Sequence, residues 1–105
     1  MLTITPNKIR EAKKLIENGW TKGTYFRDQY GKSRYGFKPG YKCCLIGDCE
    51  VVLISPEHLR LIMVNYPKNR GLTGLIRFND NLNTTKEDVI EFLDYCESKV
   101  KELYA

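Results

Sequence analysis

The fold of this chain is decided by residues 84–103, which read TTKEDVIEFLDYCESKVKEL. Apolar residues recur there at every third or fourth position over about four turns, which is the spacing of one helix face. Thr84 with Glu87, or Thr85 with Asp88, would form a capping box at the start of this helix. We therefore expect a long amphipathic helix whose inner face is formed by Val89, Phe92, Leu93, Cys96, Val100 and Leu103.

A second amphipathic helix is predicted near the start of the sequence, over residues 6–18. Thr5 is a good N-cap residue, and Pro6 suits the first helical position. Gly19 is placed to cap the other end, and Trp20 is expected to fold back as an anchor in the core. The apolar stripe of this helix is formed by Ile9, Ala12, Leu15 and Ile16.

The middle of the chain is harder to assign. Residues 43–54 read CCLIGDCEVVLI and are mainly apolar, with β-branched residues near the end, so periodicity does not separate a buried strand from a buried helix. Propensity favours a strand for residues 50–54. Ser55 then caps a further helix, which Pro67 ends. A short strand is expected at residues 75–78 and a turn at residues 79–83.

Residues 21–42 differ from the rest, because they hold four of the eight glycines and read TKGTYFRDQYGKSRYGFKPGYK. Residues 25–27 and 34–37 would pair as two short strands of a hairpin. Together with the helices, this predicts one domain over residues 1–105. Its class is α+β and mostly helical, with three to four helices around one core and a small β-hairpin or ordered loop.

Charge is distributed unevenly along the sequence. The net charge of +4 is made up of +2 in residues 1–20, +5 in residues 21–42, zero in residues 43–85 and −3 in residues 86–105. Aromatic residues and cations alternate in the basic stretch, and both are enriched at protein interfaces. The predicted binding residues are Tyr25, Arg27, Tyr30, Lys32, Arg34, Tyr35 and Lys38.

Three functions are compatible with this pattern. The first is a small non-enzymatic interaction protein that binds a protein partner through residues 24–42, here named the aromatic segment. The second is binding of single-stranded nucleic acid by the same rings and cations. The third is a ligand-binding or enzymatic domain that uses Asp28, Cys44, Asn79 and Asp80, if the fold brings them together. The rings would otherwise serve only to order a glycine-rich stretch.

The four cysteines predict buried, reduced thiols rather than a metal site. Their spacing contains no C-x-x-C pair, and His58 is the only histidine. We expect no metal and no cofactor. A thiol nucleophile would need a base, and His58 is expected to be exposed or to cap its helix.

No membrane segment is expected either. The longest apolar runs, residues 51–54 and 61–64, have four residues each, and lysines and arginines interrupt the first thirty residues. A cytoplasmic protein is therefore predicted, in the host cytoplasm if a phage encodes it.

Several short motifs resemble a family of small uncharacterised proteins from actinobacteria, cyanobacteria and bacteriophages, which is catalogued as a domain of unknown function. The motifs extend over about residues 8–100. They are Gly19-Trp20 with Gly23, Arg27-Asp28 with Gly31, Cys44-Leu45-Ile46-Gly47, Phe78-Asn79-Asp80, Thr84-Thr85, Asp88-Val89 and Asp94.

The resemblance implies that residues 43–50 begin a helix rather than a strand. It leaves the strand prediction in place for residues 51–54. It supplies no catalytic residues. It does suggest a phage accessory or anti-defence protein that binds a host protein. Two positions depart from the family pattern, since Asp48 stands where alanine is usual and Phe78 where tryptophan is usual.

Overall fold

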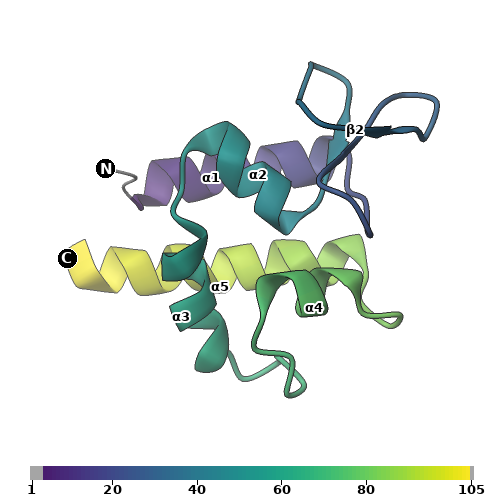
Figure 1. The fold of residues 1–105 in the computed structure, drawn as a ribbon. Coiled ribbons are helices and arrows are strands. Elements are labelled where there is room, and N and C mark those ends of the chain that lie inside the picture. Colours follow the sequence, from purple (N-terminus) through teal and green to yellow (C-terminus); the bar gives the residue numbers. More distant parts are fainter. Residues whose placement is uncertain (1–3, 105) are drawn as a thin grey trace.

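Two long antiparallel helices lie side by side, and the shorter helices pack against them (Figure 1). The computed structural model describes residues 4–104, and in it α1 (Pro6–Asn18) lies alongside α5 (Lys86–Tyr104). Three shorter helices, α2 (Leu45–Val52), α3 (Pro56–Val64) and α4 (Leu75–Asp80), cover them. The described residues therefore contain five helices, more than the three to four expected, but the mostly helical α+β class is confirmed.

The ends of α1 and α5 form as the sequence predicts. Thr5 Oγ1 accepts a hydrogen bond from Lys8 N at 3.2 Å, and Gly19 caps the C-terminus of α1. Of the two capping boxes, the one that forms joins Thr85 and Asp88. Thr85 N donates to Asp88 Oδ2 at 2.9 Å, and Asp88 N donates to Thr85 Oγ1 at 3.2 Å. These local signals fix where both long helices begin.

Helices α1 and α5 are also joined by ion pairs at the edge of their shared apolar face. Glu97 of α5 accepts from Arg10 Nε at 2.9 Å and lies 3.1 Å from Lys13 Nζ. Burial alone would raise the pKa of Glu97, but the hydrogen bonds from Arg10, Lys101 and Lys13 lower it to about 2. The carboxylate therefore stays charged and paired.

The expected hairpin is present, but its strands are shorter than predicted and a third strand joins them. Strand β1 (Phe26–Arg27) pairs antiparallel with β2 (Ser33–Arg34) and with β3 (Lys42–Cys43), in the order β2-β1-β3. Phe26 lies opposite Arg34 on one side and Cys43 on the other. Residues 35–37, predicted as strand, form no ladder.

Both strands predicted in the middle of the chain are wrong. Residues 45–52 form α2, so the helical start that the resemblance implied is confirmed, and the strand at residues 50–54 is not. Residues 75–80 form α4, so helix replaces the predicted strand at 75–78 and the first two residues of the turn predicted at 79–83. Both segments are short and buried among other helices, where tertiary packing overrides the propensity of β-branched residues.

The core lies between the helices and extends beneath β1. Every helix contributes fully buried side chains, and the apolar faces predicted for α1 and α5 mostly point inward, although Leu103 of α5 is exposed. Trp20 is half-buried at the margin of this core rather than at its centre. No helix within residues 4–104 is long and apolar enough to cross a bilayer. The largest buried side chains are Phe78, Phe92, Ile9, Ile16, Leu45, Ile54, Leu59 and Met63.

Candidate functional site

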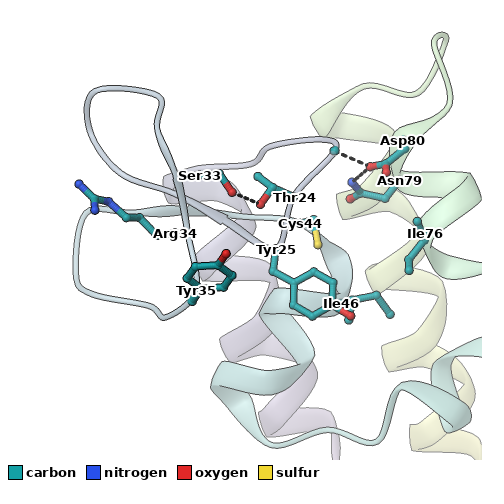
Figure 2. Close-up of a pocket in the computed structure, with 11 residues that line it drawn as sticks. Thr24, Tyr25, Ser33, Arg34, Tyr35, Cys44, Ile46, Ile76, Asn79 and Asp80 are labelled. Atoms are coloured by element: carbon teal, nitrogen blue, oxygen red, sulfur yellow. Dashed lines mark hydrogen bonds between the residues drawn. The ribbon is translucent and has the colours of Figure 1, made fainter.

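A pocket of about 310 Å³ opens between the hairpin, α2 and α4 (Figure 2). Three chain segments that are far apart in sequence meet there. The hairpin contributes one wall, the start of α2 the floor, and α4 the opposite wall. The lining residues are Gly23, Thr24, Tyr25, Ser33, Arg34, Tyr35, Cys44, Ile46, Ile76, Asn79 and Asp80.

Asn79 is the buried residue that holds these segments together. Its Oδ1 accepts from Trp20 Nε1 at 2.7 Å and from Leu45 N, the first residue of α2, at 3.0 Å. Its Nδ2 donates to Thr21 O at 3.1 Å and to Asp80 Oδ1 at 2.9 Å. The amide therefore uses all four of its hydrogen-bonding positions. Asn79 therefore joins α4 to α2 and to the loop after α1.

Asp80 lies on the rim of the pocket and is exposed. Its Oδ1 accepts from Gly23 N at 3.0 Å as well as from Asn79 (Figure 2). Its other oxygen, Oδ2, has no hydrogen bond or ion pair within residues 4–104. Asp80 therefore presents a carboxylate that is held from one side and open on the other.

Cys44 forms the floor of the pocket and the N-cap of α2. Its Sγ accepts from Gly47 N at 3.4 Å, and it is only 5% exposed. Burial raises the pKa of this thiol, and the negative charge of Asp80 adds to the rise, while amide hydrogen bonds from Gly47 and Ile46 oppose it. The group is therefore a neutral thiol at pH 7.

Gly47 allows α2 to approach the hairpin this closely. A Cβ at this position would lie 2.5 Å from the Tyr25 carbonyl oxygen and 2.9 Å from the Phe26 ring. Because no side chain fits in that space, the C-x-x-G spacing of Cys44 and Gly47 has a packing reason.

Asp28, the fourth residue of the predicted cluster, does not line the pocket. It is buried beneath the hairpin turn, where Oδ1 accepts from Tyr30 N at 2.9 Å and Lys32 N at 3.0 Å. Oδ2 accepts from Arg34 Nε and pairs with Arg34 Nη2, both at 2.8 Å. Burial would raise the pKa of Asp28, but these bonds to the charged form hold it below the ordinary value. Asp28 thus organises the turn.

Arg27 also fixes the hairpin from within. Its Nε donates to Thr21 Oγ1 at 2.9 Å, its Nη1 to Gly31 O at 3.0 Å and its Nη2 to Lys22 O at 3.3 Å. Arg27 and Arg34, both predicted as binding residues, are therefore engaged with the protein itself. The Arg34 side chain extends away from the other pocket residues (Figure 2).

The remaining predicted binding residues face solvent. Tyr30 is 84% exposed and Tyr35 is fully exposed, whereas Tyr25 is 43% exposed and packs at the pocket. Lys32 and Lys38 are exposed and form no ion pair in the described part of the chain. The aromatic segment therefore divides into residues that hold its shape and residues that its folding does not use.

The other cysteines lie in the core, as predicted. Cys43, Cys49 and Cys96 are buried free thiols that form no disulfide with one another, and burial raises the pKa of each. Among residues 4–104 no group of three metal-ligating side chains converges. His58 is exposed on α3 and does not line the pocket, so it is not placed as a base for Cys44.

The structure thus brings together Cys44, Asn79 and Asp80 and leaves Asp28 apart. Sequence reasoning did not identify the apolar walls supplied by Ile46 and Ile76. The sequence held one weak signal for these walls. Ile46 lies within the C-x-x-G motif of Cys44, and Ile76 lies shortly before the Phe-Asn-Asp motif of Asn79 and Asp80.

A family model described as "Family of unknown function (DUF6197)" matches residues 3–99. No curated protein and no solved structure matches the chain.

Proposed function

Because the chain belongs to the DUF6197 family, whose description assigns no activity, we propose a function from the geometry alone. The protein is a small non-enzymatic interaction domain that binds a protein partner through the exposed face of the aromatic segment. The observation that carries this proposal is that the exposed rings of Tyr30 and Tyr35 belong to a segment whose backbone is held by hydrogen bonds from its own side chains.

The fixed loop matters because ordering a flexible segment on binding opposes association. Asp28 holds the amides of Tyr30 and Lys32, and Arg27 holds the carbonyls of Lys22 and Gly31. These buried and half-buried polar groups order the turn without covering its outer face. The segment is therefore pre-organised for a partner.

The outer face carries the residue types that dominate binding energy at interfaces. Tyr30 and Tyr35 each present a large ring to water. Among the described residues, neither ring packs against another aromatic ring. Lys32 and Lys38 lie in the same segment. Tyrosines are enriched among interface residues whose removal weakens binding strongly.

Charge supports the same face. Elsewhere in the described residues, cations commonly lie beside carboxylates of α5, as in the pairs of Lys13 with Asp94 and of Lys68 with Glu91. The lysines of the aromatic segment are not paired in this way among the described residues. An acidic surface on the partner would complement them. The role that we propose is that of a phage accessory or anti-defence protein with a host protein as its partner.

Affinity capture tests this proposal with variants that keep the fold. Tyr30→Ser/Tyr35→Ser removes both exposed rings, and Leu82→Ser is the matched control because Leu82 is 92% exposed outside the aromatic segment. We expect unfolding free energies within about 0.5 kcal/mol of the original protein for both variants. A partner identified by mass spectrometry should be retained by Leu82→Ser and lost by the double variant. If the double variant keeps every partner, this face is not the binding surface.

Single-stranded nucleic acid is the second candidate, because exposed rings beside unpaired lysines also suit base stacking. It predicts binding of a short oligonucleotide that weakens steeply as salt is raised and that the double variant abolishes. Binding that is absent at about 50 mM salt would remove this alternative.

A further inference from the structure

The pocket between the hairpin, α2 and α4 shares Tyr25 and Tyr35 with the aromatic segment, but its remaining lining residues give it a chemistry that the exposed face lacks. We propose that it binds a primary ammonium or guanidinium group carried on an apolar stem, with Asp80 as the counter-ion. The combination that points to this ligand is an open carboxylate at the rim of a mainly apolar cavity.

Asp80 is positioned as an acceptor before any ligand arrives. Gly23 N and Asn79 Nδ2 both donate to Oδ1, and Asn79 is itself buried and fully bonded. The second carboxylate oxygen has no partner within residues 4–104. A carboxylate held in this way can accept a charge-assisted hydrogen bond from a cation without first being ordered.

The walls suit an apolar stem of modest length. Ile46, Ile76 and the ring of Tyr25 surround the hollow, and the neutral thiol of Cys44 forms its floor (Figure 2). The Tyr25 and Tyr35 rings also offer faces toward which a cation is attracted. A volume of about 310 Å³ lies within the range of small-molecule sites.

The nearby cations of the protein are engaged elsewhere. Arg34 lines the pocket, but its guanidinium is bound to Asp28 at 2.8 Å and turned away. Lys22 donates to the carbonyl of Asn81 at 2.5 Å and forms no ion pair with Asp80. Of the side chains that line the pocket, Asp80 therefore carries the one formal charge that is not neutralised by an ion pair.

Matched probes of opposite charge test the proposal directly. Phenethylamine and phenylpropanoate carry the same ring on short stems but end in an ammonium and a carboxylate. Nuclear magnetic resonance titration would follow the amide of Gly23, which donates to Asp80. We expect phenethylamine to shift this amide and to bind at least about tenfold more tightly than phenylpropanoate. Ethylamine, which lacks the ring, should bind more weakly than phenethylamine because it does not reach the apolar walls.

The source of the cation is distinguished by a further probe. Lysine blocked as its acetyl and methylamide derivatives represents a side chain presented by a peptide, whereas phenethylamine represents a free amine. Tighter binding of the blocked lysine assigns the pocket to a basic side chain, and tighter binding of phenethylamine assigns it to a small amine. Both results support the cation site.

Asp80→Asn is the decisive variant, because the amide oxygen can still accept from Gly23 and Asn79 while the charge is gone. It should weaken phenethylamine binding about tenfold, whereas Glu11→Gln, which removes an exposed carboxylate on α1, should leave binding unchanged. Equal affinity for the two charged probes, unchanged amine binding in Asp80→Asn, or no binding of any cationic probe would overturn the proposal. Tyr30 does not line the pocket, and Asp80 lies outside the aromatic segment. Because Tyr30→Ser alone leaves the cation site intact and Asp80→Asn leaves the exposed rings intact, failure of this site and failure of the proposed partner surface are separate results.

Discussion

The hairpin and helix α2 each bury one aspartate, and the two residues have opposite surroundings. Asp28 in the hairpin is 3% exposed and accepts bonds from two backbone amides and a guanidinium. Asp48 in α2 is fully buried, and neither of its carboxyl oxygens has a hydrogen-bond partner among residues 4–104. The same side chain is therefore a structural centre in one region and an unsatisfied group in the other.

The difference teaches that partners, rather than burial, decide the charge state of a buried acid. Hydrogen bonds hold the pKa of Asp28 below its ordinary value despite burial, whereas burial alone raises the pKa of Asp48 to about 9. Asp48 is thus a neutral carboxylic acid at pH 7, among the buried thiols of Cys43 and Cys49. Asp28 therefore stabilises the hairpin through its hydrogen bonds, whereas the unsatisfied carboxyl of Asp48 destabilises α2.

The largest effect is expected when Asp48 is replaced. The unfolded chain ionises this carboxyl above a pH of about 4, but the folded protein keeps its proton to a pH of about 9. In that interval the unfolded state binds fewer protons, so the free energy of unfolding falls as pH rises. Asp48→Ala should therefore stabilise the protein by about 3 kcal/mol at pH 7, measured by urea denaturation.

The pH dependence separates this explanation from a simple packing effect. The gain from Asp48→Ala should shrink as pH is lowered from 8 towards about 4, because the acid is then protonated in both states. A gain that is independent of pH, or a loss of stability at pH 8, would show that Asp48 has a partner or a charge state other than the one inferred.

A smaller effect, with the opposite sign, is expected for Asn79→Ala at the junction of the two regions. The change removes four hydrogen bonds and leaves Trp20 Nε1 and Leu45 N without their acceptor. We expect a loss of about 2 kcal/mol in unfolding free energy. Asn81→Ala, two residues later in the sequence and only half-buried, is the comparison and should have a smaller effect. Equal effects would mean that Asn79 does not join the segments.

The smallest effect on the whole molecule is expected for Asp28→Asn, because it acts on the hairpin alone. The amide keeps an acceptor for Tyr30 N and Lys32 N but no longer pairs with Arg34. Hydrogen exchange at the Tyr30 and Lys32 amides should become about tenfold faster, while amides of α5 are unchanged.

The pH trend of this third variant runs opposite to that of Asp48. Because the folded pKa of Asp28 is lowered, its contribution is present above the unfolded pKa and is lost as pH falls through the folded one. The difference in exchange between the original protein and Asp28→Asn should therefore disappear in acid. Uniformly faster exchange in α5 would show that the hairpin is not an independent unit.

Local signals in the sequence were sufficient for the long helices. Thr5 with Pro6 and Thr85 with Asp88 fix where α1 and α5 begin, because a cap acts within one turn of its own position. They were not sufficient for α2 and α4. Val51 and Val52 favour a strand by propensity, yet they lie at the end of a helix that packs on α1 and α4.

The candidate site shows the same division. The sequence identified the aromatic segment and named Cys44, Asn79 and Asp80 as residues that might meet, but it offered no means of telling that Asp28 lies apart from them. It also gave no indication that Arg27 and Arg34 would be bound to the hairpin itself, since their acceptors are set by the turn geometry.

The sequence by itself thus determined the mixed charged and apolar composition, the capped amphipathic helices and the concentration of rings and cations in one segment, because these depend on the chain itself or on neighbours within a few residues. Only the tertiary structure decided which polar groups are satisfied. Asn79 reaches Leu45, Asp80 reaches Gly23, and Asp48 reaches no hydrogen-bond partner in the part of the chain that the structure describes. Hydrogen bonds act over about 3 Å, so a partner distant in sequence can be assigned only once the chain has folded.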